Sequence, residues 1–298
     1  MTPATPPATP AKPPIQHPAD FPLFRQEGSF LLPTSLTAGP WYPNTQHGSA
    51  MLAMVALAVE QWEFAERLSP NQKPNPRQVV RMTVDMMRAA PVQPVEVVTR
   101  IIKEGRSVEL LEIDMQADGE RCIRASVLRF RCEDLPVDAS WHGCAAGQAP
   151  KLPPPLGFDP FVHARARDGL HLAIELRVDI EASPAILWMR LRQPVVEGRA
   201  TSPLARVALA ADWTYSVPVL THHLKTGTHF GKDAFFAINP DTTINLIRPA
   251  EGEWIGLQSL SALDDLGAGL ASARIFDERG LVGRCTQSIL VRGVPPVL

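Results

Sequence analysis

The sequence predicts an α+β protein in which one unit is repeated in tandem, each copy an antiparallel β-sheet wrapped around a central helix. Three observations support this prediction. The same order of helix and strand patterns occurs twice, and matching segments recur about 160 residues apart. The 298 residues are 45% hydrophobic and 20% charged, which is typical of a globular protein with room for two domains.

We expect four regions along the chain. Residues 1–20 are rich in Pro, Ala and Thr and predict an extended tail, because proline fixes φ and lacks a backbone donor. Residues 21–134 predict the first unit and residues 161–298 the second, which carries the candidate catalytic residues. Between them, residues 135–160 contain a Pro/Gly cluster and predict a linker.

In the first unit, one strand and one helix precede a run of long strands. The helix is predicted at Ala50–Arg67, which is rich in Ala, Leu, Met and Glu and is followed by Pro70. Asp118-Gly119 predicts a tight hairpin between the last two strands. A helix followed by antiparallel strands favours a sheet wrapped around that helix. The predicted strands are Leu23–Leu32, Val79–Met87, Val95–Ile102, Ser107–Ala117 and Glu120–Arg131.

The second unit repeats this order. Ser202-Pro203 is a typical N-cap and first-turn pair, and it predicts a helix that continues to about Ala211. The predicted strands are His171–Asp179, Ala185–Leu191, Thr242–Ile247, Glu253–Ser261, Ala268–Asp277 and Leu281–Val291.

The repeat can be counted directly. Residues 83–88 (TVDMMR) match residues 243–248 (TINLIR) at a separation of 243 − 83 = 160. The hairpin glycines Gly119 and Gly280 are separated by 280 − 119 = 161, which we interpret as one inserted residue. A period this long indicates a duplicated domain rather than a solenoid.

Composition excludes several classes of partner. A formal net charge of −2 without a Lys/Arg block predicts no nucleic-acid partner. The longest apolar run, residues 50–59, is shorter than the ~20 residues that a membrane-spanning helix needs, so no membrane partner is expected. The N-terminus lacks the apolar region of a secretory signal, and the four cysteines are scattered. We therefore expect reduced thiols and a cytoplasmic location.

The two copies differ at three polar positions. By the 160 separation, Asp241 stands opposite Arg81, and by the 161 separation Gln287 stands opposite Ser126. Ser261, at the end of a predicted strand, has an arginine or an isoleucine opposite it. Polar groups that the duplicated fold does not require indicate a site. Asp241, Ser261 and Gln287 are therefore the candidate catalytic residues.

Several short motifs follow one another along the chain. They are Gly39-Pro-Trp41, His47-Gly-Ser49, Ile238-Asn-Pro-Asp241, Arg248-Pro249, Glu253-Trp254 and Gly280-Leu-Val-Gly-Arg-Cys-Thr-Gln287. In this order they resemble a known family, the acyl-CoA thioesterase II-like double-hotdog proteins, over roughly residues 21–292. The resemblance implies a double-hotdog fold, hydrolysis of acyl-CoA, no cofactor or metal, and an Asp/Ser-or-Thr/Gln site that holds a water.

Transferred to this sequence, the family aspartate falls on Asp241 and the glutamine on Gln287. The hydroxyl falls on Ser261, or a shift of one residue puts Ala262 there and leaves no hydroxyl. Asp241 would accept a proton from the water or orient it, while Ser261 and Gln287 would hold that water. Asp212, after the second predicted helix, is a rival carboxylate that also fits an ordinary end-of-helix turn.

His47, Gly48 and Ser49 are the candidate substrate-binding residues. Backbone N–H groups at a helix start are donor-rich and slightly positive, so they would bind the thioester oxygen. The family has His-Gly-Gly at these positions. Ser49 therefore adds a side chain at a position where we expect a close approach to the backbone.

Two other functions stay open. One is a catalytically weak or inactive protein that binds acyl-CoA or acyl-carrier thioesters. The other is a hotdog hydratase, which needs an aspartate and a histidine close in sequence, and no histidine follows His229. The absence of G-x-S-x-G argues against an α/β-hydrolase. Assembly into a homo-oligomer also stays open.

Overall fold

The computed structural model describes residues 16–40, 42–68, 76–133, 135–136, 149–157, 159–161, 167–227 and 235–293. Most of the predicted tail and much of the predicted linker lie outside these residues. Within them, no helix is both long enough and apolar enough to cross a membrane.

In the described part of the first half, the chain forms six strands and one long helix. The helix, α1, spans Gly48–Leu68, and a short 3-10 turn, η1, spans Ser35–Thr37. The strands are β1 (Phe24–Glu27), β2 (Phe30–Pro33), β3 (Arg77–Met86), β4 (Val95–Glu104), β5 (Val108–Ala117) and β6 (Glu120–Arg131).

Seven strands and an interrupted helix lie in the described residues of the second half. The helical elements are α2 (Leu170–Ala173), α3 (Pro203–Ala211), η3 (Asp212–Thr214) and α4 (Ser216–Thr226). The strands are β7 (Ile174–Asp179), β8 (Ile186–Leu191), β9 (Phe235–Ile238), β10 (Asp241–Leu246), β11 (Trp254–Leu263), β12 (Ala268–Asp277) and β13 (Gly280–Gly293).

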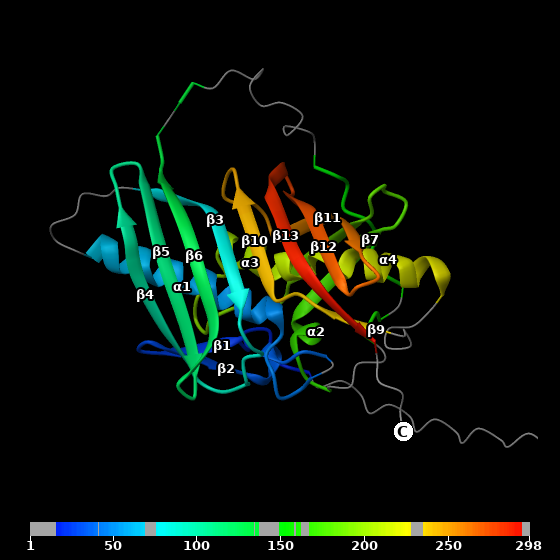
Figure 1. Cartoon of the computed structure of the whole chain (residues 1–298), viewed down its shortest axis with the longest axis horizontal. Helices are drawn as coiled ribbons and strands as arrows, with labels where there is room; N and C mark the ends of the chain where they lie inside the picture. The colour runs from blue at the N-terminus through cyan, green and yellow to red at the C-terminus, as the bar shows by residue number, and fades with distance from the viewer. Residues whose placement is uncertain are drawn as a thin grey trace, which may run out of the picture.

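One antiparallel sheet contains all the described strands (Figure 1). Their order is β1-β2-β4-β5-β6-β3-β10-β13-β12-β11-β8-β7, and β9 pairs with β13 beside this path. Read inward from either edge, the two halves give the same pattern, with β1 matching β7, β5 matching β12 and β3 matching β10. The predicted tandem double hotdog is confirmed by this arrangement.

A pseudo-twofold axis passes between β3 and β10. Thr83 pairs with Thr243 where these strands meet, and their hydroxyl oxygens are 3.3 Å apart. The two residues are 160 positions apart, so each is the counterpart of the other. Such self-pairing at the axis is the geometry of a symmetric dimer, here enclosed in a single chain.

The separation of 160 holds through the last hairpin as well, which corrects the inferred insertion. Ala117 pairs with Glu120 and Asp277 pairs with Gly280, so both ends of the turn are 160 residues apart (277 − 117 and 280 − 120). Gly280 therefore corresponds to Glu120 and not to Gly119. Both hairpins also have a register irregularity just before this pair.

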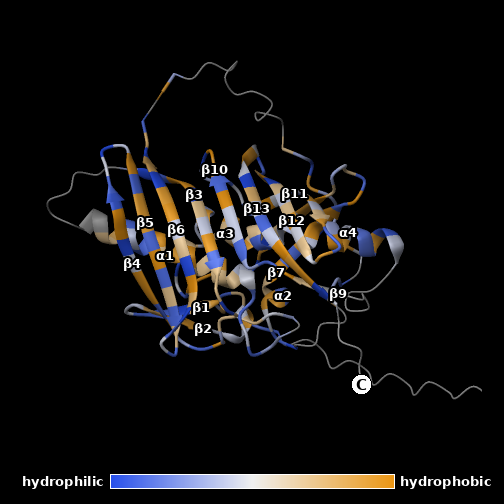
Figure 2. Cartoon of the chain, viewed as in Figure 1, coloured by the Kyte–Doolittle hydropathy of each residue, from blue (hydrophilic) through white to orange (hydrophobic). Residues whose placement is uncertain are grey.

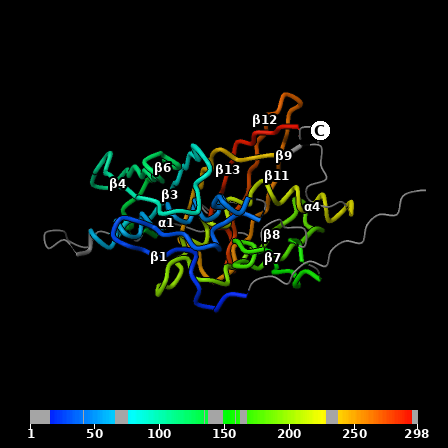
Figure 3. The backbone as a smooth tube through the Cα atoms, turned by 90° about the horizontal axis from the view of Figure 1, so that it is seen from below, coloured from blue at the N-terminus to red at the C-terminus, as the bar shows by residue number. Residues whose placement is uncertain are grey.

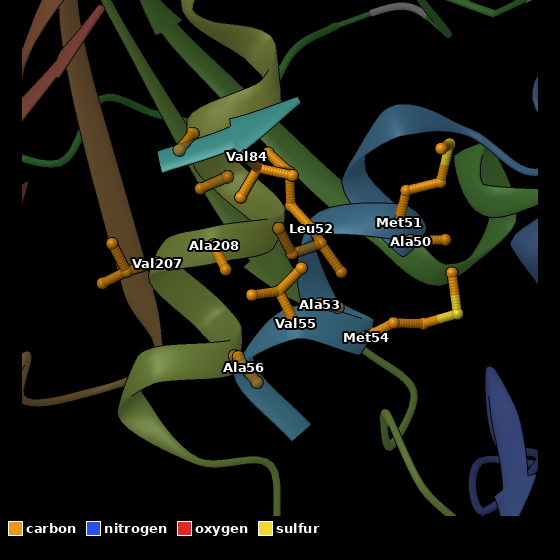
Figure 4. Close-up of a cluster of buried hydrophobic side chains, with 14 of the residues drawn as sticks. Ala50, Met51, Leu52, Ala53, Met54, Val55, Ala56, Val84, Val207 and Ala208 are labelled. Atoms are coloured by element: carbon orange, nitrogen blue, oxygen red, sulfur yellow. The ribbon is translucent and has the colours of Figure 1, made fainter. Parts of the chain in front are cut away.

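The core lies where α1 crosses α3. The apolar run 50–59 is buried along its whole length, as expected of a helix that is apolar on all sides. Figure 4 shows Ala208 of α3 facing Leu52, Ala53 and Val55 of α1. Small residues at such a crossing let two helices approach closely. Seen from below, α1 lies between β3 on one side and β1 on the other (Figure 3).

The strands show the alternation expected when one face of a sheet covers a core (Figure 2). In β13, residues 284–289 alternate between exposed and buried positions, so Cys285, Gln287 and Ile289 point inward. This alternation determines which polar residues of neighbouring strands can lie on the same face of the sheet.

Some local predictions were wrong. The predicted strand Leu23–Leu32 is a hairpin that turns at Gly28, where φ is +60°. His171 lies in the helical turn α2 and not at the start of a strand. The elements α4 and β9 were not predicted, and Pro218 in the first turn of α4 obscures its helical pattern.

Candidate functional site

The second helix is interrupted at Asp212. The helix α3 is buried along most of its length and ends at Ala211, and Asp212 begins the 3-10 turn η3. The side chain of Asp212 is only 5% exposed. A buried carboxylate is costly unless charged or hydrogen-bonding groups surround it, so its partners identify the site.

Three polar side chains converge on this carboxylate. The Nδ2 of Asn239 donates to Oδ1 at 2.8 Å, and the hydroxyl of Ser49 donates to Oδ2 at 3.2 Å. The Nδ1 of His47 lies 3.1 Å from Oδ2. Burial is the largest single effect on Asp212 and raises its pKa. The bond and charge of His47 and the bonds from Asn239 and Ser49 together outweigh burial, so the pKa of Asp212 lies below its ordinary value.

The carboxylate lies against the first turn of α1, which comes from the other half of the chain. A Cβ on Gly48 would be 2.4 Å from Oδ1 of Asp212, too close for any side chain. Among the described residues, the N–H of Gly48 has no hydrogen-bond partner. The start of a long helix is also slightly positive, which favours an anion there.

The departure from His-Gly-Gly does not block this approach. Gly48 is the position that requires glycine, whereas Ser49 is accommodated as a buried residue. Its hydroxyl accepts a hydrogen bond from the indole Nε1 of Trp213 at 3.0 Å. The added side chain therefore becomes a partner of Asp212.

His47 has one nitrogen that faces two groups. The N–H of Ser49 donates to Nδ1 at 3.1 Å, and the same Nδ1 is 3.1 Å from Asp212. Nδ1 can accept from the N–H of Ser49 only with its lone pair, that is, without a proton. If Nδ1 carries a proton, it donates to the carboxylate of Asp212 instead. The ring stacks on Trp213 with 5.8 Å between ring centres.

Gln287 fixes the main chain that carries Asp212. Its buried amide nitrogen donates to the hydroxyl of Thr242 at 3.0 Å and to the carbonyl of Asp212 at 3.2 Å. Its oxygen accepts from the N–H of Tyr215 at 3.0 Å. These bonds connect the helix break to β10 and β13, which gives the interrupted segment a fixed position.

The first copy has no such polar pair on its matching strands. At a separation of 160, Thr242 corresponds to Met82 and Gln287 to Val127, and all four side chains are buried. The counterpart of Gln287 is thus Val127, which replaces the predicted Ser126. The two copies therefore differ more in polarity at this position than the sequence comparison indicated, because the counterpart of the glutamine is an apolar valine.

The predicted set Asp241, Ser261 and Gln287 does not converge. Thr242 faces Gln287, so its neighbour Asp241 points to the opposite face of the sheet, where it accepts from the N–H of Ser288 at 2.8 Å. Ser261 is exposed and shares a row with Ala271 and Gln287, two strand spacings or ~10 Å from the glutamine. Of the three, only Gln287 lies next to Asp212.

Asp212, Asn239 and Thr242 were not chosen from the sequence. Asp212 was considered only as a rival carboxylate, and it does lie at an end-of-helix turn. One signal was available: a carboxylate directly after seven mostly apolar helical residues indicates a polar group carried into a core. His47, Gly48 and Ser49, the predicted substrate-binding residues, do lie at this carboxylate.

Comparison with solved structures shows the same fold. A proposed thioesterase from Novosphingobium aromaticivorans DSM 12444 has a TM-score of 0.63 at 19% identity, over 92% of this chain and 100% of that one. Acyl-CoA thioesterase II TesB2 from Mycobacterium marinum has a TM-score of 0.57 at 15% identity, over 92% and 96%. A protein of unknown function with a hotdog fold from Alicyclobacillus acidocaldarius has a TM-score of 0.62 at 14% identity, over 94% and 100%. Such low identities establish the fold alone.

Two family models cover most of the sequence. The acyl-CoA thioesterase N-terminal domain matches residues 37–130, and the acyl-CoA thioesterase C-terminal domain matches residues 134–291. Among curated proteins, none matches the chain. The two domain matches follow each other in the order expected of a tandem pair. This chain belongs to the acyl-CoA thioesterase family.

Proposed function

We propose that this protein hydrolyses the thioester of an acyl-CoA to a free acid and CoA, with Asp212 as the group that orients and deprotonates the attacking water. The observation that supports this most directly is the buried carboxylate at the start of α1, which polar partners surround and whose pKa lies below its ordinary value. Family membership supports the substrate class.

The carboxylate has acceptor capacity left for a water. Each of its oxygens has two lone-pair sites, and the bonds from Asn239 and Ser49 use one on each oxygen. The amide oxygen of Asn239 offers a further acceptor beside it. A water bound there would have its proton directed at Asp212 and its lone pair at the thioester carbon.

The reaction then needs one bond made and one broken. The water oxygen attacks the carbonyl carbon, a proton passes to Asp212, and negative charge develops on the carbonyl oxygen. The N–H of Gly48, which has no hydrogen-bond partner among the described residues, lies at the positive end of α1 and would stabilise that charge. Collapse of the intermediate breaks the C–S bond, and the departing CoA sulfur takes up the proton.

The lowered pKa of Asp212 has two consequences. The carboxylate is ionised throughout the neutral range, so the site is competent without a prior proton loss. A carboxylate with a lowered pKa is also a weak base, so proton abstraction alone accelerates the reaction little. Its larger contribution is therefore orientation of the water, within the factor of about 10²–10⁴ typical of such groups.

The experiment is a thiol-release assay across acyl-CoA chain lengths, with binding measured in parallel. Asp212→Asn is expected to lower kcat by at least about 100-fold while acyl-CoA still binds. Asp241→Asn is the matched control because its side chain bonds Ser288 on the outer face, and it is expected to retain activity.

Two outcomes would refute the proposal. If the wild type binds acyl-CoA but releases no thiol at any chain length, the protein is a thioester-binding protein. If Asp212→Asn hydrolyses as fast as the wild type while Asp241→Asn does not, the carboxylate on the outer face is the functional one.

A further inference from the structure

We propose that Ser49 is a positioning residue for Asp212: its hydroxyl, aligned by the indole of Trp213, keeps the carboxylate ionised and fixed in orientation. This inference rests on the proposed function of Asp212 for its catalytic consequence. The link between the side chains can be tested without it.

The polarity of this hydrogen-bond chain has one solution. The indole Nε1 of Trp213 can only donate, and an ionised carboxylate can only accept. The hydroxyl of Ser49 lies 3.0 Å from Nε1 of Trp213 and 3.2 Å from Oδ2 of Asp212. It must therefore accept from Trp213 and donate its single proton to Asp212. The indole thus sets the direction of that proton.

Ser49 donates to Oδ2 whether or not Nδ1 of His47 carries a proton. The other group near this oxygen, Nδ1 of His47, also accepts from the N–H of Ser49 at 3.1 Å, so in that state it offers no proton to the carboxylate. Asn239 serves only Oδ1. Removing the hydroxyl would leave Oδ2, on a side chain that is only 5% exposed, with Nδ1 of His47 as its remaining neighbour among these three partners.

Titratable groups from the neighbouring elements also face this site. Burial, the largest effect, lowers the pKa of His171 of α2, and the charge of His47 adds to this lowering. Burial raises the pKa of Cys285 of β13 to about 12, with charges from Asp212 and Asp241 adding to it, so it stays a thiol. These groups are unchanged in every variant below, so their contributions cancel when variants are compared at one pH.

The pH dependence has a definite sign. Asp212 has a folded pKa below its unfolded value of about 3.9, so its ionised form stabilises the fold above that pH. That stabilisation is lost as the pH falls through the folded pKa. Ser49→Ala moves the folded pKa upward, toward the ordinary value. The stability gap between wild type and variant is therefore largest at neutral pH and shrinks in acid.

The experiment combines urea unfolding at pH 7 and at low pH with kcat/KM measured against pH. Ser49→Ala is expected to move the acid limb of kcat/KM upward by about one pH unit, the size of one hydrogen bond to a charged group. Trp213→Phe is expected to move it less, in the same direction. In an Asp212→Asn background the pH-dependent part of the Ser49→Ala gap disappears.

Ser202→Ala is the matched control for activity. Ser202 stands at the start of α3, where its hydroxyl hydrogen-bonds to the carboxylate of Glu60, so this variant removes the same kind of bond at the related helix start. It is expected to lower stability and leave the acid limb in place.

A stability gap that stays the same at both pH values, with an unmoved acid limb, would overturn the proposal and reduce Ser49 to a packing residue. Failure of the proposed function would give a different set of results. In that case the wild type hydrolyses no acyl-CoA, yet the pH-dependent gap and its loss in the Asp212→Asn background still report the link between Ser49 and Asp212.

Discussion

Gly48→Ala tests whether the approach of the carboxylate to α1 matters for catalysis. The new methyl carbon would be 2.4 Å from Oδ1, 2.7 Å from Oδ2 and 2.8 Å from Cγ of Asp212. Non-bonded heavy atoms settle at about 3.5 Å, so the carboxylate must move by about 1 Å. Asp212 is a short side chain held by several partners, and it cannot swing away without losing them.

A displacement of this size at a reacting group costs about 100-fold in rate, or about 2.7 kcal/mol in the barrier. The chain need not unfold, because alanine is a better helix former than glycine. We therefore expect Gly48→Ala to fold with a lower unfolding free energy, because the displaced carboxylate loses hydrogen bonds, and to lower kcat for acyl-CoA about 100-fold. Urea unfolding and thiol release measure the two effects.

Gly39→Ala is the matched control. A Cβ there would have its nearest neighbour, Cδ2 of His47, at 3.8 Å, an ordinary contact. It adds the same methyl group near the same site without a clash. If Gly48→Ala hydrolyses acyl-CoA as fast as Gly39→Ala, the reasoning from close approach is refuted.

Three further predictions follow from other groups. Burial, the largest effect, raises the pKa of Glu60 and outweighs the opposing hydrogen bond from Ser202. The wild type should therefore lose stability as the pH rises through that pKa, whereas Glu60→Gln should lack this loss. Urea unfolding between pH 4 and 8 measures the difference. Asp277→Ala leaves Arg248 without the carboxylate it bonds at 2.5 and 2.7 Å and should cost about 3–5 kcal/mol of unfolding free energy. Ser261→Ala, on an exposed side chain, should leave kcat within about twofold of the wild type in the thiol-release assay.

The duplicated fold could be predicted from the sequence because its signals are local. Residues 120–131 alternate as a strand should and begin after Asp118-Gly119, and β6 has the predicted bounds. The apolar run 50–59 similarly predicted a buried helix, and α1 is buried there. Each of these signals needs only neighbouring residues.

The site could not be predicted in the same way. The choice between Asp241 and Thr242 depends on which face each residue takes, and a shift of one residue reverses every side chain in a strand. The burial of Asp212 depends on Ser49 and its neighbours, which are 163 residues away in the sequence. The apolar helical residues before Asp212 indicate that it is buried, but no local pattern identifies the distant partners that surround it.

The pairing of Thr83 with Thr243 at the pseudo-twofold axis has a consequence for how this chain can change. In a symmetric dimer of identical subunits, every substitution occurs twice, so a polar residue needed at one site also weakens the core at the other. Within one chain the two copies can diverge. Met82 and Val127 keep these two positions apolar in one copy, while Thr242 and Gln287 place polar groups at them in the other. A single chain can therefore carry a buried polar site in one copy without carrying it in both.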